Sequence, residues 1–242
     1  MYLNCHSYYS LRYGMMSVEQ LVQCAIAANA PAIALTDINN TTAIPMFAGE
    51  CARNGIRPVA GIEFRDGNEL RYIGIARNNK GLRELNEFLS KINSEKAQVP
   101  FPAPVFSESY VIYPLNKRPG RKLSENERIG IKPRELGSLL TSARPSDRNS
   151  MVLLQPVTFS SENEIPIHRS LRAIDNNMLL SHLNPSQCAG EDEFFMDPSR
   201  LKQLLEENRW IAGNTEKLLG DCTLDFDSKS VKNKKVFSAS RY

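Results

Sequence analysis

The sequence is short of the residues that build covalent or metal-bound frameworks. Its 242 residues include five cysteines, three histidines and one tryptophan. The cysteines are odd in number, widely spaced and without a C-x-x-C pair: Cys5, Cys24, Cys51, Cys188 and Cys222. Such spacing argues against a disulfide framework or a thiolate zinc site. We therefore expect a reduced, cytoplasmic protein.

Long apolar runs are missing too. No stretch approaches the roughly 18 apolar residues that span a bilayer, and the first residues lack the layout of a signal peptide. The formal charge of +3 is too small to indicate a nucleic-acid binder. Basic clusters at 117–122 and 229–241 are interpreted as solvated linkers. Residues 237–242 contain no helix stop, so we expect the chain to be cut from a longer one.

What is present is an alternation of strand and helix patterns over the first seventy residues, which is typical of βαβ units. Ser17 and Gln20 predict a capping box, followed by apolar residues at helical spacing. Gly55 is expected to end a second helix. Expected strands lie at 1–5, 32–35, 57–62 and 70–76, and expected helices follow Ser17, cover 42–54 and begin at Asn79.

The pattern is less regular after residue 95. Segments 95–108 and 114–125 are predicted to be surface loops, and Asp197-Pro198 is a clear helix start. Other expected elements are a lone strand at 110–113, a short helix at 136–140, a strand at 151–154, a helix at 165–180 and helices up to Gly220. We predict one domain over 1–225 and a basic linker over 226–242.

Three polar residues follow the first three expected strands: His6, Asp37 and Glu63. The carboxyl ends of parallel strands meet at one end of an α/β barrel, where active sites are commonly built. Imidazoles and carboxylates that converge there can hold divalent metals, which activate water for hydrolysis. These three residues are therefore the candidate site.

The segments around them carry a specific resemblance. Asn4-Cys5-His6-Ser7 with Tyr9-Ser10-Leu11 resembles the opening motif of PHP (polymerase and histidinol phosphatase) domains, in which two histidines separated by one residue precede Ser. Ala34 to Asn40 is similar to the Leu-Thr-Asp-His-Gly-Asn segment, and Pro58 to Glu63 matches the strand ending in Gly-x-Glu. Connecting segments further on resemble the PHP domains at the amino terminus of C-family DNA polymerase III alpha subunits.

The resemblance implies an α/β fold, a distorted PHP-type (β/α)7 barrel with additional C-terminal helices. It also shows which metal ligands this chain lacks. Asn4, Ile38, Pro156 and Thr158 stand at four positions where the family has ligands. We therefore expect no catalytic residue, no cofactor and no fully occupied metal site. The residual candidates His6, Asp37 and Glu63 could hold at most one weak manganese or zinc ion.

The function implied is a structural and interaction module of a DNA polymerase III alpha subunit in replication. Its partners would be the remainder of that chain, palm and thumb, and other replisome proteins. The parent would be a DNA-directed DNA polymerase, a nucleotidyltransferase. One alternative is a metal-dependent phosphoesterase or 3′-5′ proofreading exonuclease, and another is a stand-alone PHP-like phosphatase. The sequence leaves open DNA contact, oligomeric state and whether the parent is the main or an accessory polymerase.

Structural roles compete with functional ones at the same residues. His6 and His168 are interpreted as hydrogen-bonded structural histidines, and His182 as a cation at a helix end. Asp37 could instead cap the following helix, and Glu63 could pair with an arginine. The remaining candidates have packing interpretations: Cys5 in the core, Trp210 between the last helices, and Tyr8 and Tyr9 at the barrel mouth.

Overall fold

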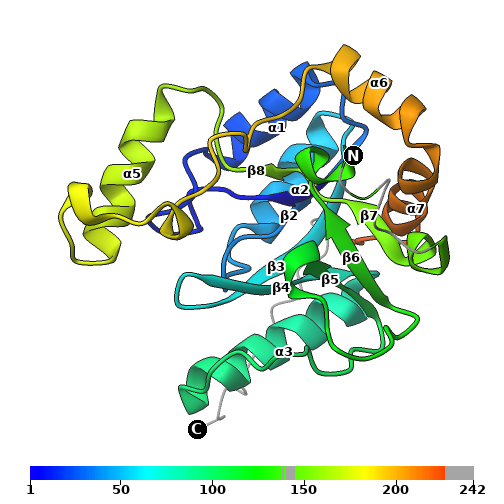
Figure 1. Ribbon diagram of the computed structural model, residues 1–242, viewed down its shortest axis with the longest axis horizontal. Coiled ribbons are helices and arrows are strands. Elements are labelled where there is room, and N and C mark those ends of the chain that lie inside the picture. Colours follow the sequence, from blue (N-terminus) through cyan, green and yellow to red (C-terminus); the bar gives the residue numbers. More distant parts are fainter. Residues whose placement is uncertain (138, 140–144, 227–242) are drawn as a thin grey trace, which may run out of the picture.

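The computed structural model describes residues 1–137, 139 and 145–226 (Figure 1). Within these residues the chain forms one eight-stranded sheet and six α-helices. The strands are β1 (Tyr2–Cys5), β2 (Ala32–Leu35), β3 (Arg57–Asp66), β4 (Glu69–Ala76), β5 (Ser109–Pro114), β6 (Glu127–Ile131), β7 (Met151–Leu153) and β8 (Pro156–Val157). The α-helices are α1 (Val18–Ala27), α2 (Ile44–Arg53), α3 (Asn79–Glu95), α5 (Glu164–Asp175), α6 (Pro198–Glu207) and α7 (Arg209–Gly220).

The sheet is curled, in the order β7-β6-β5-β4-β3-β2-β1-β8. Its two edge strands, β7 and β8, are consecutive in the chain and are separated only by Leu154 and Gln155. The three residue steps from Leu153 to Pro156 can span only about 10 Å, so the edges of the sheet approach each other. Neighbouring strands are parallel except for the antiparallel pairs β3–β4 and β4–β5. The fold is thus α/β with a curled, half-barrel sheet, consistent with the expected barrel type.

Local sequence accounts for the first helix as predicted. The Ser17 side chain accepts a hydrogen bond from the Gln20 backbone N–H (3.1 Å), and the Gln20 side chain accepts one from the Ser17 N–H (2.9 Å). These bonds satisfy two of the donors that a helix start leaves free. Val18, Leu21 and Val22 are fully buried. The apolar face of α1 therefore packs into the core at the predicted spacing.

The core has two layers. One apolar cluster contains side chains from strands all across the sheet, including Leu3, Val59 and Ile73, and it is joined by Leu218 and Leu219 of α7. Because strand residues alternate between faces, this cluster fills the concave side of the sheet. A larger cluster fills the other side, between the strands and helices α1, α2 and α3. In Figure 1, α3 lies at the lower edge, α5 to the left, and α6 and α7 to the right.

Several predicted boundaries were wrong. Glu63 was expected to end a strand, but β3 continues to Asp66 and turns back into β4 through Gly67, which has a φ of +58°. Glycine adopts this left-handed conformation without strain, so β3 and β4 form a hairpin that was not predicted. The strand at 110–113 is not alone, because β5 pairs with β4 and with the unpredicted β6.

The helix expected at 165–180 is shorter than predicted. Helix α5 ends at Asp175, and Asn177 takes a φ of +50°. The N–H of Met178 then donates to the carbonyl of Ala173 (3.0 Å), which is the hydrogen bond of a left-handed helix terminus. The 136–140 helix lies partly outside the described residues. The start of α6 after Asp197 agrees with the prediction, since that side chain accepts from the N–H groups of Ser199 and Arg200.

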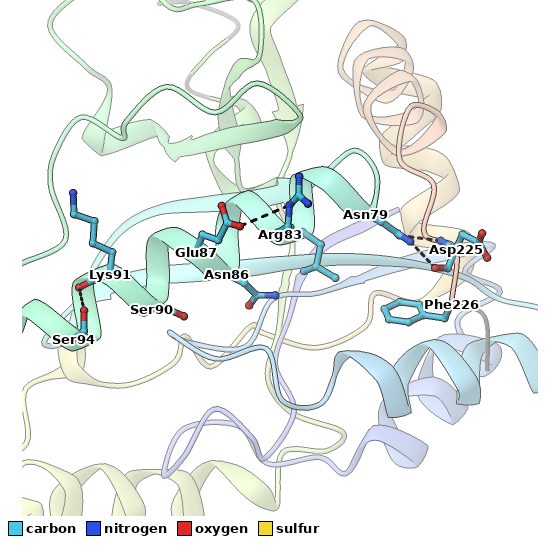
Figure 2. A pocket seen from close by; sticks show the side chains of 10 residues that line it. Asn79, Arg83, Asn86, Glu87, Ser90, Lys91, Ser94, Asp225 and Phe226 are labelled. Atoms are coloured by element: carbon cyan, nitrogen blue, oxygen red, sulfur yellow. Dashed lines mark hydrogen bonds and ion pairs between the residues drawn. The ribbon is translucent and has the colours of Figure 1, made fainter. Parts of the chain in front are cut away.

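The end of the described chain packs against α3. The Asn79 side chain donates to the carbonyl of Asp225 (2.7 Å) and accepts from its N–H (3.1 Å). Figure 2 shows this clamp, with Phe226 beside it and the polar side of α3 extending to Ser94. A groove of about 850 Å³ lies here. Apart from residue 226, the predicted basic linker lies outside the described residues. None of the described helices is long and apolar enough to cross a membrane.

Candidate functional site

The polar site lies where β1 and β2 end, and we call it the mouth. A bulge in β1 shapes it: Tyr2 pairs with Ile33 and Cys5 with Leu35, so three steps on β1 oppose two on β2. Bulges change the direction in which neighbouring side chains point. Asn4 and His6 are two residues apart, on the same face of the chain, and both reach into the mouth.

Glu63 is the centre of the mouth and is fully buried. One carboxylate oxygen, Oε2, accepts from Asn4 Nδ2 (2.8 Å) and lies 3.0 Å from His6 Nε2. The other, Oε1, is paired with the Nε of Arg65. Burial alone would raise the pKa of this carboxyl, but Arg65 and His6 hold it well below its usual range. Glu63 is therefore a charged, fully partnered carboxylate.

Asn4 completes its hydrogen bonds on the opposite side. Its Oδ1 accepts from the hydroxyl of Thr36 at 2.6 Å, while its amide nitrogen donates to Glu63. Both side chains are buried, so unpaired polar atoms there would cost stability. The neutral Asn4 side chain thus links Thr36, which follows β2, to the charged Glu63 on β3.

His6 begins a line of hydrogen bonds that crosses the mouth. Its Nδ1 lies 2.9 Å from the hydroxyl of Thr158, and that hydroxyl donates to Glu193 Oε2 at 2.6 Å. The other oxygen of Glu193 accepts from the Gly190 N–H (3.0 Å) and lies 3.9 Å from Lys132 Nζ. Strands β1 and β8 are joined in this way to the loop before α6.

Thr158 sets the direction of the hydrogen bonds in this line. A threonine hydroxyl has a single hydrogen, and Thr158 donates it to Glu193. His6 Nδ1 faces the hydroxyl oxygen of Thr158, and its Nε2 faces the carboxylate of Glu63. Thr158 therefore links His6 to Glu193.

Asp37 is held by neutral groups. One of its oxygens accepts from the Ser7 N–H and the Ser10 hydroxyl, and the other accepts from the Ser7 hydroxyl, all at 2.7 Å. Burial raises the pKa of Asp37, although these hydrogen bonds oppose the shift. The alternative role as a helix cap is wrong, because α2 begins after Ala43 with no side-chain cap. Asp37 instead fixes the loop that follows β1.

The side chains at two further positions, Ile38 and Pro156, provide no metal-binding atom to the mouth. The side chain of Ile38 packs against an apolar cluster that includes Tyr13 and Phe159. Pro156 lies in β8 beside Asn4, with which it shares the strand register. Neither side chain has a nitrogen or oxygen that could bind a metal ion.

His168 holds helix α5 to the loop between β1 and α1 and to the segment 185–190, part of which lines the mouth; we call α5 and this segment the cover. Its Nδ1 lies 2.8 Å from the carbonyl of Tyr13, and its Nε2 accepts from the Ala189 N–H at 2.9 Å. These partners require a neutral ring protonated at Nδ1. Burial lowers the pKa of His168 to about 4. Arg172, one turn along α5, donates to the carbonyl of Gln187 (2.7 Å), so the cover is fixed by buried polar contacts.

The other singled-out residues lie in structural positions. Cys5 is fully buried in β1, and His182 is exposed. Trp210 is partly buried on α7, where Arg148 lies over its ring. Tyr8 is 44% exposed and stacks on Tyr9, with ring centroids 4.9 Å apart.

The mouth opens into a cavity of about 520 Å³. Its lining includes Asn4, His6, Glu63, Arg65, Lys132 and Glu193. Within the described parts of the chain, no group of three or more His, Cys, Asp or Glu side chains is arranged to hold a metal ion. Each carboxylate of the mouth has protein hydrogen-bond or ion-pair partners instead.

Comparison with known proteins identifies the part of the chain that carries this site. Residues 3–114 match the family model described as PHP domain. This match covers a little under half of the chain. Curated DNA polymerase III alpha subunits match the N-terminal part of the chain. That of Staphylococcus aureus is 34% identical over 94 residues, 38% of this chain. That of Escherichia coli is 34% identical over 96 residues, 37% of this chain.

The alignment spans 9% of the length of the Staphylococcus relative and 8% of that of the Escherichia relative. Two solved structures are more distant. An amidohydrolase from Chromobacterium violaceum is 23% identical with a TM-score of 0.32, over 39% of this chain and 34% of that one. A putative metal-dependent phosphoesterase from Bifidobacterium adolescentis is 11% identical with a TM-score of 0.32, over 84% of this chain and 94% of that one.

The matched PHP segment supplies only part of the mouth. Asn4, Asp37 and Glu63 lie inside residues 3–114, whereas Thr158 and Glu193 lie outside them. Sequence reasoning did not find Glu193, Lys132 or Arg65. Arg65 had a local signal, because it follows Glu63 by two residues and side chains at that spacing share one face of a strand. Glu193 lies in a loop and had none.

Proposed function

We propose that this chain is the PHP domain of a DNA polymerase III alpha subunit that hydrolyses no phosphoester itself. Its role is to support the polymerase through its fold and its contacts. One observation carries this proposal: the central carboxylate, Glu63, is already neutralised and hydrogen-bonded by Arg65, His6 and Asn4. The related polymerase subunits support the assignment to replication.

The chemistry of the donors argues against metal-dependent hydrolysis. A catalytic metal needs several protein ligands and one open position for water. Asn4 and Thr158 offer only neutral oxygens that already have partners, and Ile38 and Pro156 offer none. These residues do not fit the metal centre that a PHP fold implies. A single weakly held manganese or zinc ion at His6 and Glu63, helped by Asp37, is the most that they would support.

We extend the proposal to the architecture. If β7 and β8 are counted as one strand interrupted at Leu154 and Gln155, the sheet has seven strands, as a distorted (β/α)7 barrel would. Residues 1–225 would then be the barrel with its C-terminal helices, and 226–242 a basic linker. That linker would lead towards palm and thumb.

The partner would be the remainder of the polymerase chain, together with other replisome proteins in the cytoplasm. Support for an interaction role comes from α5 and the turn after it. Ile167 and Ile174 are 55% and 65% exposed on one side of α5, and Leu179 and Leu180 are also exposed. Exposed apolar side chains that gather in one region are typical of protein contact surfaces.

The test is a hydrolysis assay on the purified chain and its His6→Ala variant. Each is incubated with manganese or zinc chloride and one of three substrates: p-nitrophenyl phosphate, bis(p-nitrophenyl) phosphate or a 3′-labelled oligonucleotide. We expect no turnover above buffer with either metal. Turnover that disappears in His6→Ala would replace the proposal with a metal-dependent phosphoesterase or a 3′-5′ proofreading exonuclease. Turnover of small phosphomonoesters alone would indicate a stand-alone PHP-like phosphatase.

A further inference from the structure

Arg65 holds an unusual place in the mouth. It follows Glu63 by two residues on β3, and the two side chains are only 10% and 1% exposed. A buried carboxylate without a counter-charge is strongly unfavourable, which is why buried acids are paired or bind metal ions. In this chain the cation beside Glu63 belongs to the same strand.

The guanidinium of Arg65 has two sets of partners. Its Nε is paired with Glu63 Oε1, and one terminal nitrogen donates to the hydroxyl of Tyr13 at 2.9 Å. Its central carbon also lies 4.2 Å from the centroid of the Tyr13 ring, a cation–π distance. Arg65 thus connects the central carboxylate to the loop between β1 and α1.

That loop is in turn attached to the cover. The backbone carbonyl of Tyr13 is hydrogen-bonded to His168 on α5, and Arg172 lies 5.3 Å from the Tyr13 ring. A continuous path of buried contacts therefore leads from Glu63 through Arg65 and Tyr13 to α5. The path depends on Arg65, the cation next to Glu63.

We propose that Arg65 is a built-in cation that takes the place of a metal ion in this mouth. It neutralises Glu63 and, through Tyr13, connects the mouth to α5. The inference rests on the proposed function, because it presumes a mouth that works without metal. It adds that the Arg65 side chain supplies the positive charge that a bound ion would otherwise supply.

The ion pairs elsewhere on the same hairpin differ in burial. Arg71 on β4 pairs with Asp66 and Glu69, but its side chain is 24% exposed and these acids are 25% and 50% exposed. Ion pairs in contact with solvent contribute little to stability. Arg71→Met is therefore the matched control for Arg65→Met.

The experiment measures thermal unfolding of the full chain with EDTA and with zinc chloride. The variants are Arg65→Met, Arg65→Lys, Glu63→Gln, the double variant Glu63→Gln/Arg65→Met and the Arg71→Met control. We expect Arg65→Met to lower the melting temperature by on the order of 10 °C. Arg65→Lys should lower it less, because the charge remains. The double variant should recover part of the loss, because neither charge is left alone, and Arg71→Met should change little.

Hydrogen exchange shows whether Arg65 holds the 10–16 loop and α5 in place or stabilises the whole chain. In Arg65→Met, amides of the 10–16 loop and of α5 should exchange faster than in the unmodified chain, while those of α3 should keep their rates. If Arg65→Met fails to fold, Arg65→Lys and the double variant supply the same comparison.

Two kinds of contrary result can be told apart. An Arg65→Met melting temperature equal to that of the unmodified chain, a double variant no better than Arg65→Met, or equal exchange throughout would overturn the role of Arg65 and leave the proposed function intact. A melting temperature of the unmodified chain that falls in EDTA and returns with zinc would mean that a bound metal holds the mouth. That result would contradict the proposed function as well.

Discussion

Two buried carboxylates in the same mouth are stabilised in different ways. Glu63 lies beside Arg65 and His6, and its pKa is held below its usual range despite burial. Asp37 receives hydrogen bonds only from Ser7 and Ser10, and burial raises its pKa. The Glu63 side therefore depends on opposite charges, whereas the Asp37 side depends on neutral donors.

Under the proposed function, the difference indicates which part of a metal site can be kept without its metal. A carboxylate surrounded by hydroxyl and amide donors fixes a loop without any cation. A carboxylate in the centre of the barrel needs a counter-charge, and this chain supplies one from β3. Ranking the effects of substitutions on the two sides tests this contrast.

The largest effect is expected at Glu63. Glu63→Gln leaves Arg65 buried without its partner, and breaking a buried ion pair in this way costs about 3–5 kcal/mol. Urea unfolding should show this loss in the free energy of unfolding. Glu50→Gln on α2 is the control, because its partner Arg53 is 71% exposed. Equal losses in both variants would mean that the buried Glu63–Arg65 pair contributes no more to stability than a pair with an exposed arginine.

The next effect is a pH dependence from His168. Its pKa is about 4 in the folded chain and about 6.5 when unfolded. Between those values the unfolded chain binds a proton that the folded chain does not, so stability falls as pH falls from about 7 to 4, by about 3 kcal/mol. Glu63, with its lowered pKa, adds a loss only as pH drops below its ordinary value. Urea unfolding across this range should show the loss. In His168→Asn the free energy of unfolding should vary less with pH. In His182→Asn it should vary with pH as in the unmodified chain.

A smaller effect is expected on the neutral side. Asp37→Asn keeps one acceptor oxygen but turns an amide N–H₂ towards a serine donor, and a lost hydrogen bond of this kind costs about 1–3 kcal/mol. The raised pKa of Asp37 means that losing its charge costs little. In urea unfolding, the loss of free energy of unfolding in Asp37→Asn should be smaller than that in Glu63→Gln and larger than that in the control Asp66→Asn. A loss larger than that of Glu63→Gln would reverse the comparison.

The smallest effect is expected outside the mouth. Ile174 is 65% exposed on α5. Ile174→Ser should change the free energy of unfolding by no more than about 0.5 kcal/mol, because exposed side chains away from special contacts contribute little. Thermal unfolding of the isolated chain checks this. A loss of several degrees would mean that the outer side of α5 packs within the chain and is not a free contact surface.

Much of the fold followed from periodicity and capping. Helices α1 and α3 and the start of α6 lie where Ser17, Asn79 and Asp197 predicted them, because their signals are local. The β3–β4 hairpin and strand β6 were missed. The pairing of β6 with β5 and β7 depends on partners 16 and 22 residues away. The two-residue turn at Gly67 and Asn68, which joins β3 to β4, was not predicted.

The site was less predictable. The resemblance directed attention to His6, Asp37 and Glu63, and the structure brings His6 and Glu63 into contact but places Asp37 in a separate hydrogen-bonded group. Glu193 reaches the mouth through a hydrogen bond to Thr158, 35 residues away. No local pattern predicts such a contact, because it is set by how β8 and the loop before α6 pack together.

The most direct measurement is the metal content of the purified chain after exposure to manganese and zinc and removal of unbound ions. The account predicts well below one ion per chain, because Arg65, His6 and Asn4 already contact the carboxylate oxygens of Glu63. One or more tightly bound ions per chain would contradict it and show that the mouth still works as a metal centre.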